Sequence, residues 1–243
     1  MQLRNKIFNN YYKIHGKFLD GQINNNLQKW FNSVCDNSYL DHLPSRQSQI
    51  LEIGCGKGYI LKWLKNNNFT KIEGVDLSPE DVKIAKEYVG INNIYYGDVF
   101  NYLSNKKSTY DCILGKDILE HIEKNKLEEF LNIIKDALKP GGKVIFQVPN
   151  MDWIMASHER YMDLTHEIGF IKESLAQLLR LYFVSVEIYP VEYNFSSNII
   201  GKFTFKFINP IVVNLTRLWL KILGAGAGDC WFEYREILGV GKK

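Results

Sequence analysis

The sequence predicts a doubly wound α/β fold, in which a mostly parallel sheet carries helices on both faces. First, short apolar segments alternate with amphipathic segments of helical period from about residue 50 onward. Second, a glycine-rich turn from Gly54 to Gly58 joins an apolar segment to a helical one. Third, the next two apolar segments lead into turns that carry Asp76 and Asp98. Ligands bind outside the carboxyl ends of the strands of such sheets, so we expect the functional residues directly after strands.

The individual elements follow from periodicity and turn residues. Ser78 is an expected N-cap, and Pro79 takes the first position of the helix that follows it. The Lys-Pro-Gly-Gly turn at 139–142 ends a later helix. Helices are expected at 59–66, 79–88, 126–138 and 172–181, and strands at 49–53, 71–75, 94–96, 110–114, 143–148, 183–189 and 232–240.

We expect a single domain of 243 residues with two appendages. Residues 1–45 are polar and helical in pattern, and residues 190–231 form an insertion between the last two strands. Each appendage is too short to bury a good core of its own. The expected organisation is an N-terminal appendage at 1–45, a ligand-binding core at 46–189, the insertion at 190–231 and a closing strand at 232–243.

Composition narrows the functional classes. A net charge of +3 gives no support for nucleic-acid binding. The four cysteines form no Cys-x-x-Cys pair, so no structural zinc site is expected. No residue is assigned as a metal ligand, and a metal requirement is left open. The N-terminus shows no signal-peptide core, and no apolar run is long enough to span a membrane. We therefore expect a cytoplasmic protein with reduced thiols.

The glycine turn distinguishes between two kinds of cofactor. Dinucleotide-binding loops have the pattern G-x-G-x-x-G, whereas here position 59 is Tyr and the pattern is G-x-G-x-G. Glu52 stands two places before Gly54. A carboxylate there would repel a pyrophosphate, but it suits a ligand with an ammonium and a sulfonium and no phosphate, such as S-adenosylmethionine.

Two aspartates supply the other expected cofactor contacts. Asp76 lies about 20 residues beyond the glycine turn, the offset at which an acid binds ribose hydroxyls. Asp98 can accept from an adenine amino group, with Leu77 and Val99 as apolar walls. Either aspartate can also serve as a helix N-cap, a role that is compatible with ligand binding.

The motifs LEIGCGKG, GVDLS, GDVF, YDCILGKDILEHI and LKPGGKVIFQVPN occur in this order over residues 49–150. In order and spacing the chain resembles the class I S-adenosylmethionine-dependent methyltransferases. The resemblance implies a Rossmann-like seven-stranded sheet of order 3-2-1-4-5-7-6 with the last strand antiparallel. It also implies S-adenosylmethionine as methyl donor, S-adenosylhomocysteine as product, and cofactor contacts at Glu52, Gly54, Cys55, Gly56, Gly58, Asp76, Leu77, Asp98, Val99 and Lys116. Lys116 is unusual at its position, so its side chain should point away from the sulfonium.

A dense polar segment follows the expected strand at 143–148, on the ligand side of the sheet. Its stretch RYMDLTHEIGFIKESLAQLL resembles a segment of methyltransferases from capsule and O-antigen gene clusters, apart from Ile171 in place of the usual Thr. By this resemblance the acceptor pocket lies here, with substrate contacts at Asn150, Arg160, Tyr161, Asp163 and Thr165.

Two histidines are candidate catalytic residues. The resemblance places His166 at the acceptor pocket, and the pKa of histidine lies near working pH, as a general base requires. His121 is the second candidate, with a role on the cofactor side of the site. The alternative for His166 is a contact that orders the loop. For Arg160, which could bind an anionic group, the alternative is a surface ion pair with Glu159 or Asp163.

Residues 199–223 are apolar and aromatic with interspersed lysines and arginines. A helix is expected from Pro210 to Leu223. Plain packing against the core is the simplest expectation for this segment. A lid over the active site, a homodimer interface and a membrane-surface helix that reaches a lipid-linked acceptor are the alternatives.

The sequence therefore predicts an O-methyltransferase for a bacterial surface-polysaccharide precursor, acting on a sugar hydroxyl or a phosphate- or phosphoramidate-type oxygen. One alternative is a small-molecule O-methyltransferase for a quinone or another aromatic acceptor. Another is a non-enzymatic relative that binds the cofactor. Nucleic acid is not an expected partner, because no Asn/Asp-Pro-Pro-aromatic tetrapeptide follows Leu114 and no basic tract is present.

Overall fold

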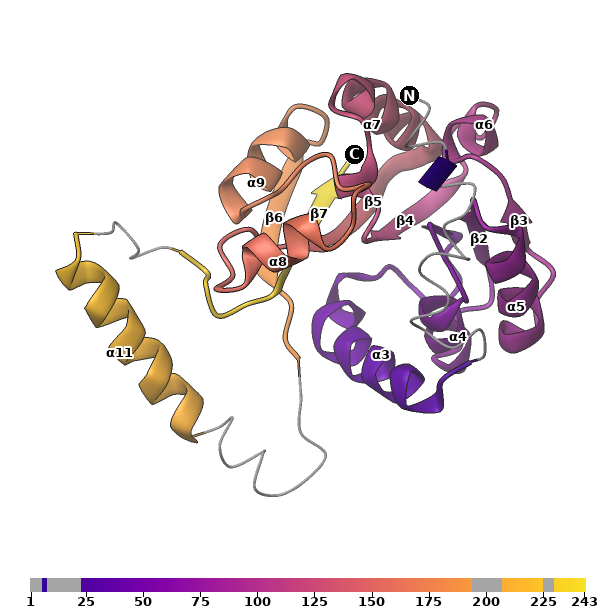
Figure 1. Ribbon diagram of the computed structural model, residues 1–243. Helices are drawn as coiled ribbons and strands as arrows, with labels where there is room; N and C mark the ends of the chain where they lie inside the picture. Colours follow the sequence, from indigo (N-terminus) through magenta and orange to yellow (C-terminus); the bar gives the residue numbers. More distant parts are fainter. Residues whose placement is uncertain (1–5, 8–22, 194–206, 225–229) are drawn as a thin grey trace.

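The structure is a computed structural model, and it describes residues 6–7, 23–193, 207–224 and 230–243. Figure 1 shows one α/β body and a helix, α11, that stands apart from it. The strands are β1 (Ile50–Ile53), β2 (Ile72–Asp76), β3 (Ile94–Tyr96), β4 (Tyr110–Lys116), β5 (Leu138–Pro149), β6 (Ser185–Pro190) and β7 (Glu236–Lys242). The α-helices are α3 (Asn25–Ser38), α4 (Tyr59–Asn66), α5 (Pro79–Val89), α6 (Val99–Leu103), α7 (Leu127–Ala137), α8 (Ala156–Tyr161), α9 (Lys172–Arg180) and α11 (Asn209–Ile222).

The sheet has the predicted topology. Its seven strands have the order β3-β2-β1-β4-β5-β7-β6, and β7 pairs antiparallel with both β5 and β6. The strand order reverses between β1 and β4: β2 and β3 are added on one side of β1, and β4 and β5 on the other. Because β1, β2 and β4 are parallel, their carboxyl ends lie at the same end of the sheet. This is the switch point at which doubly wound sheets bind ligands.

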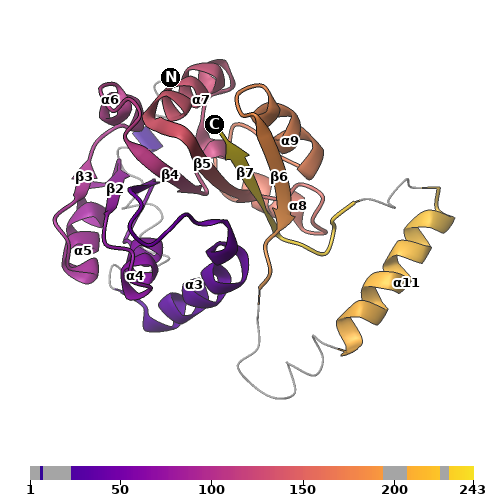
Figure 2. The ribbon, with the colours of Figure 1, turned by 180° about the vertical axis from the view of Figure 1, so that it is seen from behind.

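Two apolar layers cover the sheet. One layer packs α3, α4 and α5 against one face, through residues such as Tyr39, Trp63 and Ala85. The other packs α6, α7 and α9 against the opposite face, through residues such as Phe130 and Leu179. All four residues of β1 are buried, as expected for a central parallel strand covered on both sides. Figures 1 and 2 show the two helical layers from opposite directions.

Several element boundaries differ from the expected ones. The closing strand is Glu236–Lys242 rather than 232–240, because residues 231–235 form a turn that approaches the 150–154 loop. β5 begins at Leu138, so the Lys-Pro-Gly-Gly segment at 139–142 lies within the strand. The pairing of β5 with β4 shifts register between Tyr110 and Cys112. The short helices α6 and α8 were not expected, since five and six residues give little periodicity.

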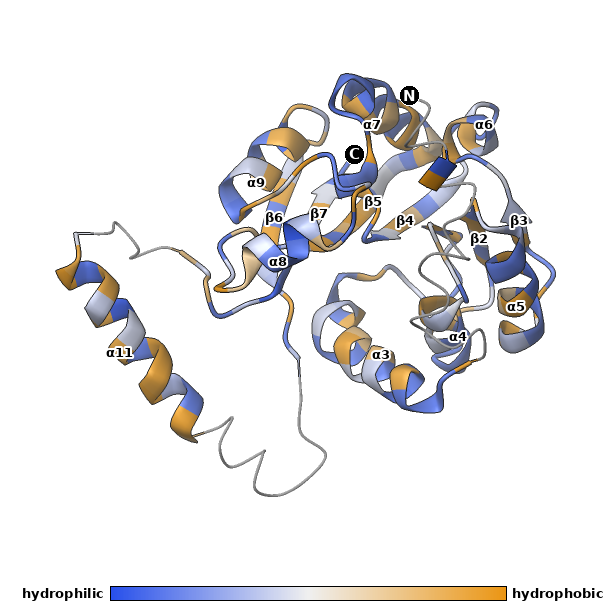
Figure 3. Ribbon diagram, viewed as in Figure 1, coloured by the Kyte–Doolittle hydropathy of each residue, from blue (hydrophilic) through white to orange (hydrophobic). Residues whose placement is uncertain are grey.

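The helix of the insertion does not pack against the core. No residue of α11 is buried, and its exposed apolar side chains include Leu215, Leu218 and Trp219. Figure 3 shows apolar stretches, coloured orange, along α11, which stands clear of the body. Arg217 pairs with Glu233 ahead of β7, at 2.6 Å. Plain packing is therefore wrong for residues 207–223, while residues 199–206 lie outside the described part of the chain. In the described ranges, no helix is long and apolar enough to cross a bilayer.

Candidate active site

A cavity of about 400 Å³ opens at the carboxyl ends of β1, β2 and β4. This volume is within the range of small-molecule and cofactor sites. Nearly all the predicted cofactor residues line it, together with one of the two candidate histidines. They are Glu52, Gly54, Cys55, Gly56, Asp76, Leu77, Val99, Lys116 and His121.

The glycine turn leaves room for a ligand at one position. Gly54 and Gly56 have φ values of 66° and 46°, which L side chains rarely adopt. A Cβ at Gly56 would meet no atom within 4 Å, so the backbone there faces open space. The Gly56 N–H donates to Oδ2 of Asp76 at 2.7 Å, and this hydrogen bond fixes the turn against the end of β2.

Gly58 does not line the cavity, although the sequence indicated a cofactor contact there. It precedes α4 with φ 79°, and a Cβ would lie 2.8 Å from Cγ2 of Val89 and 3.1 Å from Cβ of Ala85. Gly58 is thus required for the close approach of α4 and α5.

Glu52 is a buried carboxylate on the cavity wall, with a relative exposure of 3%. Within the described ranges, its Oε2 has no hydrogen-bond partner. Burial raises the pKa of Glu52 well above its ordinary value, and the charge of Asp76 adds to this effect. A buried carboxylate with one unpartnered oxygen beside an open glycine turn fits a ligand that carries positive charge, and this supports the predicted cofactor class.

The two aspartates differ in position. Asp76 lies on the cavity wall, where burial raises its pKa and the backbone hydrogen bonds from Ser78 and Gly56 partly offset that rise. Asp98 accepts from the Phe100 N–H at 2.7 Å and caps α6, between the lining residues Gly97 and Val99. Its contact with an adenine amino group remains a prediction.

Lys116 lies at the end of β4 and is held by ion pairs. Its ammonium is 3.3 Å from Oε1 of Glu236 and also bonds to Asp117. Burial opposes its charge, but Asp117 and Glu236 raise the pKa of Lys116 above the ordinary value. These pairs draw the ammonium toward β7. Its orientation relative to a sulfonium remains a prediction.

The sequence reasoning missed the aromatic part of the cavity wall. Phe31 of α3 and Tyr59 of α4 both line the cavity, and their rings stack at 5.1 Å. The Tyr59 hydroxyl also accepts from the Asn24 N–H, which ties the start of α3 to α4. The aromatic pair Trp30–Phe31 in the N-terminal segment was the available signal. The fold converts this appendage into part of the site.

The two candidate histidines lie together beside the cavity. His121 belongs to the 3-10 turn η2 (Leu119–His121), and His166 belongs to the loop between α8 and α9. Their ring centroids are 4.7 Å apart, with an interplanar angle of 61°. The backbone N–H groups of Glu167 and Ile168 donate to the carbonyl of Glu120, which anchors the loop to the turn. The structure therefore brings the two candidate histidines together in one group.

Hydrogen bonds fix the tautomer of each ring. His166 Nδ1 lies 2.9 Å from the carbonyl oxygen of Glu159, so this nitrogen is the donor. His121 Nδ1 lies 2.8 Å from Oγ1 of Thr165, whose hydroxyl donates to Asp163 at 2.7 Å. Since the threonine proton is used on Asp163, His121 Nδ1 is a donor too. In both neutral rings, Nε2 carries the lone pair.

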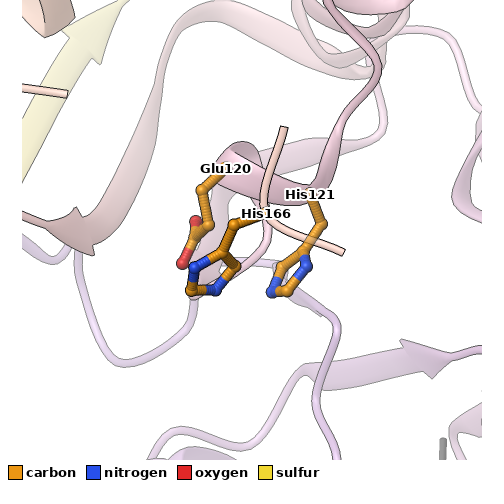
Figure 4. A group of neighbouring side chains, drawn as sticks. All are labelled: Glu120, His121 and His166. Atoms are coloured by element: carbon orange, nitrogen blue, oxygen red, sulfur yellow. The ribbon is translucent and has the colours of Figure 1, made fainter. Parts of the chain in front are cut away.

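Glu120 completes this group, and the sequence reasoning assigned it no role. Its carboxylate lies within 4.8 Å of ring nitrogens of both histidines. Figure 4 shows the three side chains together. The residue is 2% exposed, and neither carboxylate oxygen has a hydrogen-bond partner among the described residues. Burial raises the pKa of Glu120 well above its ordinary value, with Asp117 adding to the rise. The signal was an acidic residue directly before a candidate histidine.

The predicted substrate residues have several different roles. Asn150 does not fit a substrate contact, because it is fully buried and its amide nitrogen donates to the carbonyls of Trp231 and Tyr234. Asp163 and Thr165 are buried and hold His121 as described above. Arg160 donates to the carbonyls of His166 and Glu167. The alternative ion pair with Glu159 is not found among the described residues, where Glu159 binds Arg235 at 3.1 Å.

One predicted substrate residue remains on the surface. Tyr161 is 76% exposed, and its ring lies 5.5 Å from the guanidinium carbon of Arg160. Its contact with a substrate remains a prediction, as does the binding of an anionic group by the half-buried Arg160.

Comparison with curated proteins finds relatives with several acceptors. The chain is 32% identical over 114 residues to a putative protein N5-glutamine methyltransferase of Methanocaldococcus jannaschii, which covers 43% of this chain and 56% of the relative. It is 28% identical to the malonyl-[acyl-carrier protein] O-methyltransferase of Halalkalibacterium halodurans (51% of this chain, 47% of the relative). It is 21% identical to the mitochondrial ubiquinone biosynthesis O-methyltransferase of Dictyostelium discoideum (46% and 39%). The chain thus spans about half the length of the curated relatives it matches.

The fold and the family are better defined than the acceptor. A solved S-adenosylmethionine-dependent methyltransferase from Archaeoglobus fulgidus superposes with a TM-score of 0.68 at 20% identity, covering 96% of this chain and 99% of that one. A family model described as a methyltransferase domain matches residues 27–182. Because this match covers more than half of the chain, the protein belongs to the methyltransferase-domain family, and its fold is that of a solved S-adenosylmethionine-dependent methyltransferase.

Proposed function

We propose that the protein is an O-methyltransferase whose acceptor is a saccharide precursor of a bacterial surface polysaccharide. The methyl group passes from the sulfonium of S-adenosylmethionine to an oxygen of the acceptor, either a sugar hydroxyl or a phosphate- or phosphoramidate-type oxygen. The transfer is an in-line displacement, so much of the acceleration comes from holding donor and acceptor about 3 Å apart.

The observation that carries this proposal is the pair of histidines beside the cofactor cavity. A hydroxyl must lose its proton as it is methylated, and a positioned base accelerates such a step by about 10²–10⁴-fold. The His166 ring presents Nε2 as its basic nitrogen, because Nδ1 donates to Glu159. An acceptor that is already anionic needs no base, so the pair favours a hydroxyl.

Two further features support an oxygen acceptor that is polar. Two of the three relatives above are named O-methyltransferases. Helix α8, which leads into the loop that carries His166, presents the exposed Tyr161 and the partly exposed Arg160, side chains suited to a polar or anionic molecule. The protein N5-glutamine methyltransferase among the relatives is the counterexample.

A second candidate acceptor is a quinone or another small aromatic molecule. The exposed apolar side chains of α11 favour it, as does the similarity to a ubiquinone O-methyltransferase. A third candidate is a non-enzymatic protein that binds the cofactor. The intact cavity wall at Glu52, Gly56 and Asp76 disfavours it only in part, because a sensor would need the same wall.

We also propose a cytoplasmic location. All four cysteines are unpaired, and Cys35, Cys55 and Cys112 are buried. Buried free thiols are typical of proteins from reducing compartments.

The test is release of S-adenosylhomocysteine by the purified protein from S-adenosylmethionine. The acceptors are nucleotide-linked sugars, a nucleotide-activated phosphoramidate, a short-chain demethylated quinone and a membrane extract that holds lipid-linked saccharides. Turnover with a saccharide supports the proposal, and turnover with the quinone alone supports the second candidate. If the cofactor binds but no acceptor stimulates release, the O-methyltransferase proposal for these classes is wrong.

A further inference from the structure

We propose that Glu120, His121 and His166 bind a divalent transition-metal cation of the Mn²⁺-to-Zn²⁺ series beside the methyl-transfer cavity. The sequence pattern assigned no residue as a metal ligand, because the two histidines lie on separate segments that only the fold brings together. Figure 4 shows the three side chains gathered between η2 and the loop after α8.

The geometry suits three ligands of one ion. The candidate ligand atoms, one from each residue, all lie within 4.8 Å of one another. Two nitrogen or oxygen ligands about 2.1 Å from a metal with tetrahedral angles are about 3.4 Å apart. The largest separation therefore exceeds the spacing in a tetrahedral site by about 1.4 Å (4.8 Å less 3.4 Å) at most.

Each imidazole is oriented as in metal sites. Ligating histidines usually donate their second ring N–H to a carbonyl, a carboxylate or another polar group, which fixes the tautomer and the ring orientation. His166 donates from Nδ1 to the Glu159 carbonyl at 2.9 Å. His121 donates from Nδ1 to Thr165 at 2.8 Å, and Thr165 is in turn fixed by Asp163. Both rings are thereby held with Nε2 as the coordinating nitrogen.

Glu120 supplies an independent observation. A carboxylate that is 2% exposed, with both oxygens unpartnered among the described residues, is costly to ionise unless a cation compensates it. The two adjacent imidazoles cannot compensate it while neutral. A divalent cation bound between the three groups would compensate the charge of the carboxylate.

The ligand set indicates the class of metal. Two imidazoles and one carboxylate are typical of Zn²⁺, Fe²⁺ and related transition metals, whereas Ca²⁺ and Mg²⁺ prefer sites made of oxygen ligands. Three protein ligands leave coordination positions open for water or substrate.

The role of this ion rests on the proposed O-methylation. His121 lines the cofactor cavity, so an acceptor oxygen on the metal would lie next to the methyl donor. Coordination lowers the pKa of a bound hydroxyl, which releases its proton to solvent. The O–C bond then forms as the C–S bond of the cofactor breaks, and the bonding pair leaves on sulfur in S-adenosylhomocysteine. In this case His166 acts as a ligand and not as the base.

The first experiment measures metal binding without cofactor or acceptor. The metal-free full chain is titrated with Co²⁺, whose visible d–d absorption reports its coordination, and with Zn²⁺ in a calorimeter. We expect one equivalent to bind. His166→Ala and Glu120→Gln should each weaken binding at least 10-fold, as removal of a ligand does. His158→Ala is the matched control, because His158 is an exposed histidine of α8 outside the group.

Folding is checked separately, because Glu120 is buried. Glu120→Gln keeps the shape of the side chain, and the thermal unfolding of each variant is measured without metal. The proposal is overturned if the wild-type chain binds no metal, or if folded His166→Ala and Glu120→Gln bind as tightly as wild type. Methyl transfer that survives a chelator would refute the catalytic role alone. Metal binding without any turnover would refute the proposed function and leave the site standing.

Discussion

The ring of His166 lies against the ring of His121 at a centroid distance of 4.7 Å, although the two residues come from different loops of the sheet edge. The contact depends on backbone hydrogen bonds from Glu167 and Ile168 to the Glu120 carbonyl, which hold the loop after α8 on the η2 turn. The His121 ring lines the cavity, and the His166 ring lies directly beside it. The predictions below test how the surrounding residues maintain it.

Thr165→Val removes the hydroxyl that accepts from His121 and donates to Asp163, while the volume of the side chain is kept. We expect methyl transfer to fall about 10–100-fold, because His121 loses its fixed tautomer. Cofactor affinity should change little. Steady-state kinetics and calorimetric titration with S-adenosylhomocysteine separate the two effects. Thr216→Val on the exposed helix α11 is the control, and equal losses in both variants would contradict the positioning role.

Gly56→Ala and Gly58→Ala should fail in different ways. Each places a side chain at positive φ, which costs about 1–2 kcal/mol. At Gly58 the new methyl also lies 2.8 Å from Val89, so the free energy of unfolding should fall by about 2–4 kcal/mol in total. At Gly56 the methyl points into open space, so the main loss is cofactor affinity, about 10-fold or more. Urea denaturation and cofactor titration of both variants measure the two effects. A loss of cofactor affinity in Gly58→Ala but not in Gly56→Ala would contradict the prediction.

Glu52→Gln should stabilise the cofactor-free chain and weaken cofactor binding. Burial raises the pKa of Glu52 in the folded state well above its ordinary value of 4.5. Between pH 4.5 and this raised pKa, the folded state holds a proton that the unfolded state has lost. The free energy of unfolding of the wild type therefore decreases with rising pH there, and the variant lacks this component. At pH 7 we expect a gain of about 1–3 kcal/mol.

Cofactor affinity of Glu52→Gln should fall about 10–100-fold, because a charge-assisted contact is lost. Urea denaturation between pH 5 and pH 8 and calorimetric titration test both parts. Glu87→Gln on α5 is exposed and serves as the control. Parallel stability profiles for the wild type and Glu52→Gln would show that Glu52 is not the group responsible.

Lys116→Met should destabilise the chain because it leaves Glu236 buried without its cation. Loss of one partner of a buried pair costs about 3–5 kcal/mol. Glu236 also accepts from Gln147 and Tyr193, so we expect the lower end of this range. The double variant Lys116→Met/Glu236→Gln should recover part of the loss. A double-mutant cycle of unfolding free energies tests this, and simple additivity would show that the pair is not coupled.

The sheet topology and most of the cofactor wall were predictable from local patterns. Strand and helix periodicities, the N-cap at Ser78 and the glycine turn at 54–58 are signals within a few residues, and the ordered motifs supplied the strand order. The places of Glu52 and Asp76 on the cavity wall could be predicted, because Glu52 lies within one strand and Asp76 ends the next. The carboxyl ends of these strands meet at the switch point of the sheet.

Contacts between distant segments were decided by tertiary structure. Gly58 and Asn150 have structural roles that local patterns did not indicate, in the packing of α4 on α5 and in the contact with residues 231–234. The N-terminal Phe31 became part of the cavity only through the packing of α3 on α4. No motif in the sequence links Glu120 and His121 with His166. The three residues come together only because non-local hydrogen bonds place the loop after α8 on the η2 turn.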